Sequence, residues 1–112
     1  MSDPAWYAFD EGRSLGEVGS ENGRIILDDE HALGARITLE KGGYHPYSIT
    51  CGVYGSMVHT RFFSSESSAR AAFESMKPEL AAILELLQLA SDPNPDFLSA
   101  TSRIKRFIER FP

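Results

Sequence analysis

The apolar residues of this 112-residue chain change their spacing once, near residue 64. Up to that point they alternate with polar residues and are interrupted by glycine-rich turns, which is typical of β-strands. Beyond it they recur every three or four residues and glycine is absent, which is typical of amphipathic helices. The chain therefore predicts an α+β protein, with the sheet in its first half and the helices in its second half.

The first half is expected to contain four or five strands. Residues 24–28, 33–40, 47–54 and 57–63 have the strand pattern, and residues 13–19 are a further candidate. The connections between these segments are short, and strands joined by tight turns must run antiparallel. We therefore expect a four- to five-stranded antiparallel meander sheet.

The second half is expected to form a long helix and a shorter C-terminal helix. The apolar stripe of the long helix, residues 69–87, stays in phase across Pro78, which predicts one kinked helix rather than two. Residues 91–95 interrupt the pattern, and Pro95 suits the first position of the next helix, which Asn94 would cap. Two helices joined by so short a loop can pair antiparallel and pack on one face of the sheet.

Length and cysteine content indicate one small α+β domain over residues 1–112. Cys51 is the single cysteine, which excludes an internal disulfide. No apolar run approaches the roughly 20 residues of a membrane-spanning helix, and the first nine residues do not resemble a signal peptide. We expect a soluble cytoplasmic protein that does not bind membranes. Its net charge of −5 disfavours nucleic acid as a partner, because an acidic surface repels phosphates.

A two-residue type II′ turn at residues 55–56 sets the predicted register of the last hairpin. It pairs Thr50 with Arg61, and Gly52 with His59, on the face that the helices do not cover. Apolar residues of the earlier strands are then matched in the same way. The resulting row across the open face consists of Arg24, Arg36, Thr50 and Arg61.

Arginines in such a row need an offsetting charge, because like charges that face each other across a sheet destabilise it. Guanidinium groups bind carboxylates and phosphates in a bidentate manner, so a small anionic ligand is one solution. The candidate ligand-binding residues are Arg36, Thr50, His59 and Arg61. The alternative is that Glu17, Glu40 or acidic residues of the N-terminal segment neutralise the arginines.

No catalytic residue, metal ligand or cofactor is expected. His59 is not tied by the sequence to any nucleophile or carboxylate. Cys51 falls on the predicted core face, where a thiol behaves as a small apolar group. The acidic run at residues 28–31 lacks the spacing of a calcium loop and is expected to be a solvated turn.

These observations favour a non-catalytic binding or protein-interaction module that acts as a homodimer. It would meet a protein partner through the open sheet face or through its N-terminal aromatic segment, residues 6–9. The apolar residues expected on that face are Ile26, Tyr54, Met57 and Phe63. The alternative is a small anionic-ligand binding protein, or a minor enzyme, that uses Arg36, Arg61 and His59.

Overall fold

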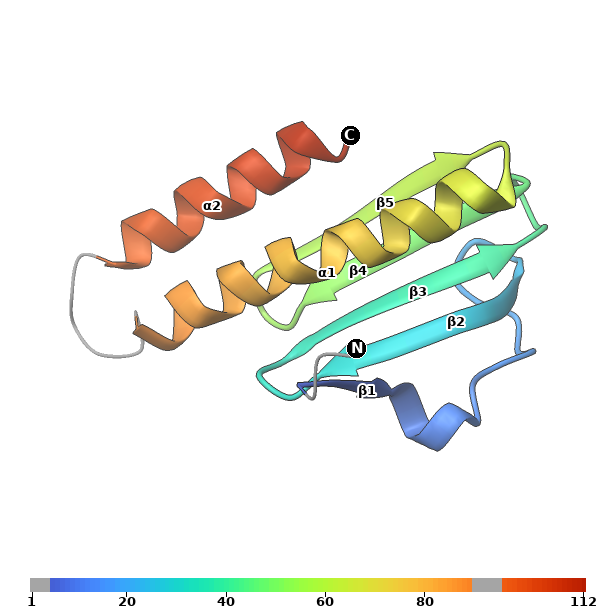
Figure 1. Cartoon of the computed structure of the whole chain (residues 1–112), viewed down its shortest axis with the longest axis horizontal. Helices are drawn as coiled ribbons and strands as arrows, with labels where there is room; N and C mark the ends of the chain where they lie inside the picture. Colours follow the sequence, from blue (N-terminus) through green and yellow to red (C-terminus); the bar gives the residue numbers. More distant parts are fainter. Residues whose placement is uncertain (1–4, 90–95) are drawn as a thin grey trace.

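The computed structural model of the chain describes residues 5–89 and 96–112. Five strands form one antiparallel meander sheet in the order β1-β2-β3-β4-β5, and two helices follow (Figure 1). The predicted α+β class is confirmed. The elements are β1 (Trp6–Ala8), the 3-10 turn η1 (Phe9–Gly12), β2 (Arg24–His31), β3 (Ala35–Lys41), β4 (Tyr47–Val53), β5 (Met57–Phe63), α1 (Glu66–Leu89) and α2 (Asp96–Arg110).

Two strand predictions at the N-terminal end were wrong. The fifth strand is β1, whereas residues 13–19 contribute only an isolated bridge between Val18 and Arg24. Residues 28–31 are not a solvated turn, because β2 continues through them to His31. Their polar side chains fit a strand because they find charged or aromatic partners on both faces of the sheet.

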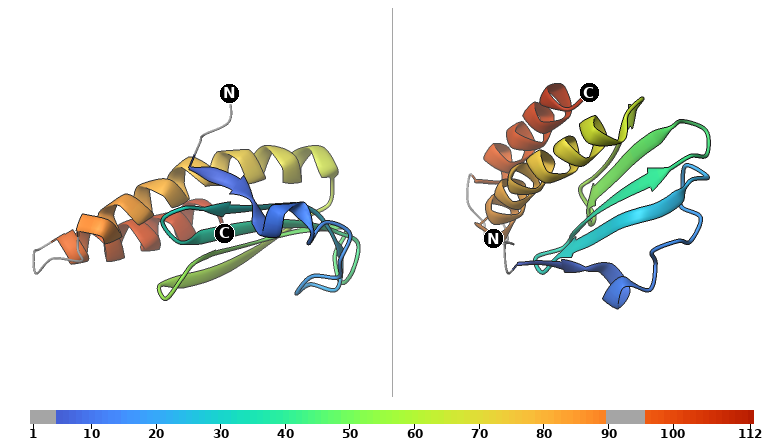
Figure 2. Two further views of the ribbon diagram at one scale, coloured as in Figure 1. Left: turned by 90° about the horizontal axis from the view of Figure 1, so that it is seen from below. Right: turned by 45° about the vertical axis from the view of Figure 1, so that its right-hand side comes forward.

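Both helices lie on the same side of the sheet, as predicted. α1 runs as one helix through Pro78 and lies over β3, β4 and β5, while α2 packs beside α1 (Figures 1 and 2). Glu79 of α1 accepts hydrogen bonds from Arg103 (2.9 Å) and Arg110 (2.8 Å) of α2, which links the two helices. The interruption predicted at residues 91–95 lies outside the described residues.

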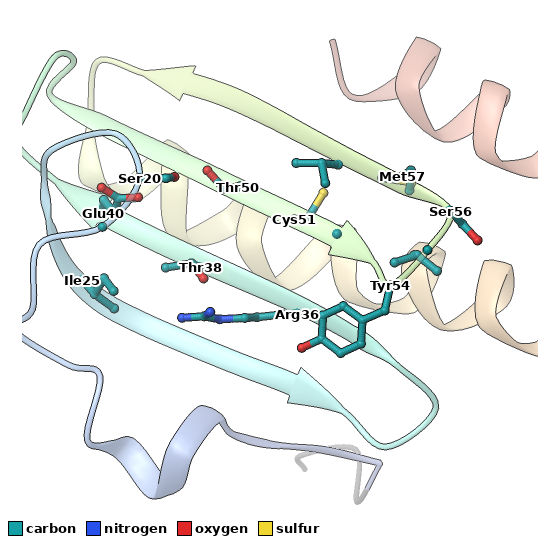
Figure 3. A pocket seen from close by; sticks show the side chains of 15 residues that line it. Ser20, Ile25, Arg36, Thr38, Glu40, Thr50, Cys51, Tyr54, Ser56 and Met57 are labelled. Atoms are coloured by element: carbon teal, nitrogen blue, oxygen red, sulfur yellow. The ribbon is translucent and has the colours of Figure 1, made fainter.

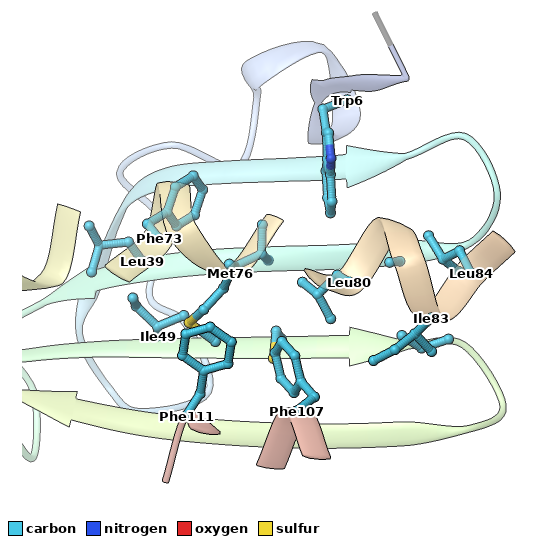
Figure 4. Packing of buried hydrophobic residues seen from close by; sticks show 14 of the residues in the cluster. Trp6, Leu39, Ile49, Phe73, Met76, Leu80, Ile83, Leu84, Phe107 and Phe111 are labelled. Carbon is cyan, nitrogen blue, oxygen red and sulfur yellow. The ribbon is translucent and has the colours of Figure 1, made fainter. Parts of the chain in front are cut away.

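The core lies between α1 and the helix-facing side of the sheet (Figure 4). Alternation along β3 and β4 supplies one layer, and the three-to-four spacing along α1 supplies the other. Three further aromatic residues join the same cluster: Trp6 of β1, Phe107 of α2, and Phe111, which directly follows α2. Its fully buried members on the sheet and α1 include Ile37, Leu39, Ile49, Cys51, Phe73, Met76, Leu80 and Ile83.

The register of β5 differs from the prediction by one residue. Three residues, 54–56, form the turn instead of two: Ser56 N donates to Val53 O (2.9 Å), and Gly55 has a φ of 79°. A type II turn requires a φ of about +80° at this third position, which glycine adopts without strain. Val53 therefore pairs with Met57 rather than with Val58. A shift of one residue moves every side chain of the strand to the other face.

The predicted row of arginines does not form. β5 turns Met57, His59, Arg61 and Phe63 towards the helices, and Val58, Thr60 and Phe62 towards the open face. In the remaining strands, Arg36 lies opposite Gly52 rather than Thr50, and Arg24 lies opposite Lys41 rather than Arg36. The shift between β3 and β4 is two residues, so the faces of those strands are as predicted.

Candidate functional site

A groove of about 590 Å³ runs across the open face of the sheet (Figure 3). Its floor is β4, where two small residues occupy the open-face positions: Thr50 has a short side chain and Gly52 has none. The flanking strands carry larger residues at the same level, Arg36 on β3 and Val58 on β5. The groove thus results from the side-chain sizes along three neighbouring strands, and its ends are Ser20 and the β4–β5 turn.

The β5 side of the open face is apolar and accessible. The side chains of Val58 and Phe62 are 77% and 49% exposed, and Tyr54 in the adjoining turn is 54% exposed. His45 stacks on the Phe62 ring with 3.8 Å between ring centroids. The predicted apolar patch was wrong in three of its four members, which pack against the core: Ile26, Met57 and Phe63.

The β2 side of the groove is organised by a buried carboxylate, Asp28. Arg36 holds it through two hydrogen bonds, from Nε to Oδ1 (2.9 Å) and from Nη2 to Oδ2 (2.6 Å). Ser14 and Thr38 donate their hydroxyls to the same carboxylate at 2.7 and 3.1 Å. The Asp28 side chain is 0% exposed, and its ion pair with four hydrogen bonds offsets the cost of burying the charge.

Arg36 is neutralised by Asp28 of the neighbouring strand rather than by Glu17 or Glu40. The hydrogen bonds that Arg36 donates to Asp28 raise the pKa of its guanidinium, which also lies 3.6 Å from the centroid of the Phe9 ring. Its Nη1 donates to no described residue. Arg36 therefore offers hydrogen-bond donors to the groove but little net positive charge.

Glu30 of β2 links β1 to the β4–β5 turn at the same end of the open face. Its carboxylate accepts hydrogen bonds from the hydroxyls of Tyr7 (2.9 Å) and Tyr54 (2.6 Å). Burial and the hydrogen bond to Glu30 raise the pKa of Tyr54 to about 12, so the phenol stays protonated at neutral pH. The Tyr54 ring is fixed beside Arg36 at the rim of the groove (Figure 3).

The opposite end of the groove depends on Glu40, whose side chain is 1% exposed. Its Oε1 accepts hydrogen bonds from the backbone N–H groups of Glu21 (3.1 Å) and Gly23 (3.0 Å). The chain passes so close that a Cβ on Gly19 would lie 2.4 Å from Glu40 Cδ. Glu40 therefore holds the 19–23 turn against the sheet, and with it Ser20, which lines the groove.

The structure separates the four predicted ligand-binding residues into two pairs. Arg36 and Thr50 lie in the groove, where the Thr50 hydroxyl is 3.4 Å from that of Thr60. His59 and Arg61 lie on the helix-covered face. His59 Nε2 contacts the Phe111 carbonyl oxygen, and Arg61 donates from Nε to the carbonyl oxygen of Pro112 (3.3 Å). These two residues hold the end of α2 and take no part in the groove.

The reactivity of the Cys51 thiol reports whether the helix-facing side of β4 is buried. Desolvation raises the pKa of its thiol to about 12, which leaves about a thousandfold less thiolate at neutral pH than in an ordinary cysteine. We expect a thiol reagent to modify the folded protein at least about a hundredfold more slowly than the protein in denaturant. Equal rates in the two states would contradict this burial.

The open face is organised by three acidic residues whose role was not predicted from the sequence, Asp28, Glu30 and Glu40. The alternation of residues 27–31 could have indicated that β2 continues through them. Leu27, Asp29 and His31 share one face of the strand, and Asp28 and Glu30 share the other. Within the described parts of the chain, no group of three or more histidine, cysteine or acidic side chains is placed to hold a metal ion.

Comparison with known proteins gives no relative. No protein-family model matches the chain, and no similar curated protein or solved structure was found. The class of the protein is therefore defined by its architecture alone, a two-layer α+β fold with one helix-covered and one open sheet face. None of the described helices has the length and apolar character needed to cross a membrane.

Proposed function

We propose that the protein is a non-catalytic protein-interaction module, acts as a homodimer, and binds an extended segment of a partner protein in the open-face groove. The groove over β4, with exposed Val58 on its β5 side, is the observation that carries this proposal. Concave sites with mostly apolar walls and a few polar groups are typical of binding sites, and exposed apolar patches are typical of protein contacts.

The charges around the groove favour a basic partner over an anionic ligand. Arg36 is paired with Asp28, while Glu17, Glu21 and Glu30 make no ion pair with any described residue. These three acids lie in the segments beside the groove rather than in its lining, where Arg36 and Glu40 are the charged residues. The surroundings of the groove therefore carry an excess of negative charge, which repels phosphates and carboxylates and attracts lysine and arginine. His59 and Arg61, needed for the anion-binding alternative, are engaged with α2.

A cytoplasmic location is part of the same proposal. The one cysteine is buried and unpaired, which suits a reducing compartment, where a small domain relies on its core rather than on disulfides. The polar atoms of the groove are hydroxyls, a neutralised guanidinium and carboxylates committed to the fold. These groups bind and position a segment, and no nucleophile paired with a base is among them.

The experiment uses peptides selected from a random display library on the wild-type protein. We expect enrichment of sequences that combine apolar residues with lysine or arginine. Thr50→Trp fills the groove and should weaken binding of a selected peptide by about tenfold or more.

The matched control is Ser75→Trp, an equally large change on the exposed side of α1. It should bind the peptide as the wild type does. Equal affinity of the wild type and Thr50→Trp for the peptide would refute the groove as the binding surface. Enrichment of acidic peptides would instead favour the anionic-ligand alternative.

A further inference from the structure

β5 is a long, regular edge strand, and its inward-pointing Arg61 is held by the carbonyl oxygen of Pro112. It ends the sheet, its seven residues keep an unbroken register with β4, and it contains neither proline nor glycine. Among the described residues, its backbone makes hydrogen bonds to β4 and to no other element. An edge of this kind presents a row of free N–H and C=O groups to another chain. The other edge, β1, is only three residues long.

We propose that two copies of this chain join through β5, in antiparallel register about a two-fold axis at Thr60, to form one continuous sheet. This inference rests on the homodimer in the proposed function and names its interface. Antiparallel edge pairing satisfies the free backbone groups of both copies at once, and a two-fold axis makes the contact self-complementary.

The side chains of β5 fit this register. With Thr60 opposite its own counterpart, Val58 lies opposite Phe62 of the second copy, so the exposed apolar side chains cover one another on the open face. On the other face, His59 lies opposite the second Arg61, which keeps the two arginines out of direct opposition. Cross-strand apolar pairs stabilise a sheet, whereas directly opposed like charges destabilise it.

The charge distribution favours the β5 edge over the β1 edge. The acidic residues of the N-terminal part belong to β2 and the segments around it, at the far side of the sheet from β5 (Figure 1). Pairing through β5 therefore keeps the acidic regions of two copies, each with a net charge of −5, at opposite ends of the joined sheet.

The end of α2 provides a second layer of contact near the axis. His59 contacts the carbonyl oxygen of Phe111, and Arg61 donates to that of Pro112, so the two residues that follow α2 lie against the centre of β5. A two-fold axis at Thr60 brings the corresponding ends of both α2 helices together above the joined strands. The continuous sheet then carries all four helices on one side and leaves both grooves open on the other.

The test is disulfide trapping with Thr60→Cys. In the proposed register the two Cα atoms at position 60 lie about 4.5 to 5.5 Å apart, within the range of a disulfide. The matched control is Thr50→Cys, which removes the same hydroxyl pair from the other strand. Its two copies would lie three strand spacings apart, about 14 Å, which is too far to bridge.

We expect wild type to sediment as a dimer at micromolar concentration, and mild oxidation to convert most of Thr60→Cys to a linked dimer on a non-reducing gel. Thr50→Cys and wild type, whose Cys51 is buried, should remain unlinked. Val58→Lys should raise the dissociation constant of the dimer about tenfold or more, because it places a charge against Phe62 of the second copy.

If the wild type is a dimer but oxidation does not link Thr60→Cys, the proposed β5 register is wrong. The homodimer would then form through another surface. A wild-type monomer at all concentrations would overturn both. Peptide binding in the groove is measured separately with Thr50→Trp, so loss of peptide binding alone would count against the partner site and leave the β5 interface intact. Equal melting temperatures of the two cysteine variants would confirm that both are folded.

Discussion

Asp28→Ala should lower the free energy of unfolding by about 3 kcal/mol, although no ligand contact is removed. The Asp28 carboxylate is fully buried and accepts hydrogen bonds from Arg36, Ser14 and Thr38. Removing one partner of a buried ion pair costs about 3–5 kcal/mol, because the other charge is left uncompensated. The Arg36 side chain is 34% exposed and can regain water, which places the expected effect at the low end of this range.

Urea denaturation of wild type and variant measures this difference. The control is Arg13→Ala, which breaks an ion pair of similar length with Asp10 on the surface, where both side chains are about half exposed or more. Exposed pairs contribute about 0 to 1 kcal/mol, so this variant should be nearly as stable as wild type. Equal small losses in both variants would show that the Asp28 network does not hold the open face together.

Glu40→Ala should lower the free energy of unfolding by about 2 kcal/mol and loosen the 19–23 turn. The variant leaves the N–H groups of Glu21 and Gly23 without their acceptor, and Gly23 is buried. An unsatisfied buried donor costs about 1–3 kcal/mol, part of which is offset because a buried charge is also removed. Glu40→Gln keeps a carbonyl acceptor and should recover part of the loss.

Amide hydrogen exchange gives the local readout for the same variant. The amides of Glu21 and Gly23 should exchange faster in Glu40→Ala, while those of β4 keep their protection. Glu17→Ala is the control, since its carboxylate makes no hydrogen bond or ion pair with a described residue. Unchanged exchange at both amides would mean that the turn is held by its backbone hydrogen bonds alone.

The fold class could be predicted because the change in apolar spacing near residue 64 is a property of the whole chain. The sequence did not allow us to predict which β5 side chains point towards the helices. This strand carries large apolar residues on both faces, Met57 and Phe63 on one, Val58 and Phe62 on the other. Alternation therefore fits either register equally well, and the choice depends on a turn of two or three residues around Gly55.

The candidate site was only half predictable for the same reason. Arg36 and Thr50 lie on strands with one clearly apolar face, and their side chains point to the open side as expected. His59 and Arg61 moved to the helix-covered face with the register of β5. The partner of Arg36 depended on how far β2 continues, since Asp28 reaches it only when residues 28–31 are strand.

The most direct test of the proposed function is chemical-shift mapping of the labelled wild-type protein with a peptide selected on it. If the peptide binds in the groove, the largest chemical-shift changes should occur at the backbone amides of Thr50, Gly52 and Val58, which form the floor and one border of the groove. The chemical shifts of amides on the solvent side of α1, such as that of Ser75, should not change. Changes confined to α1 and α2, with the β4 amides unmoved, would contradict the open sheet face as the binding surface.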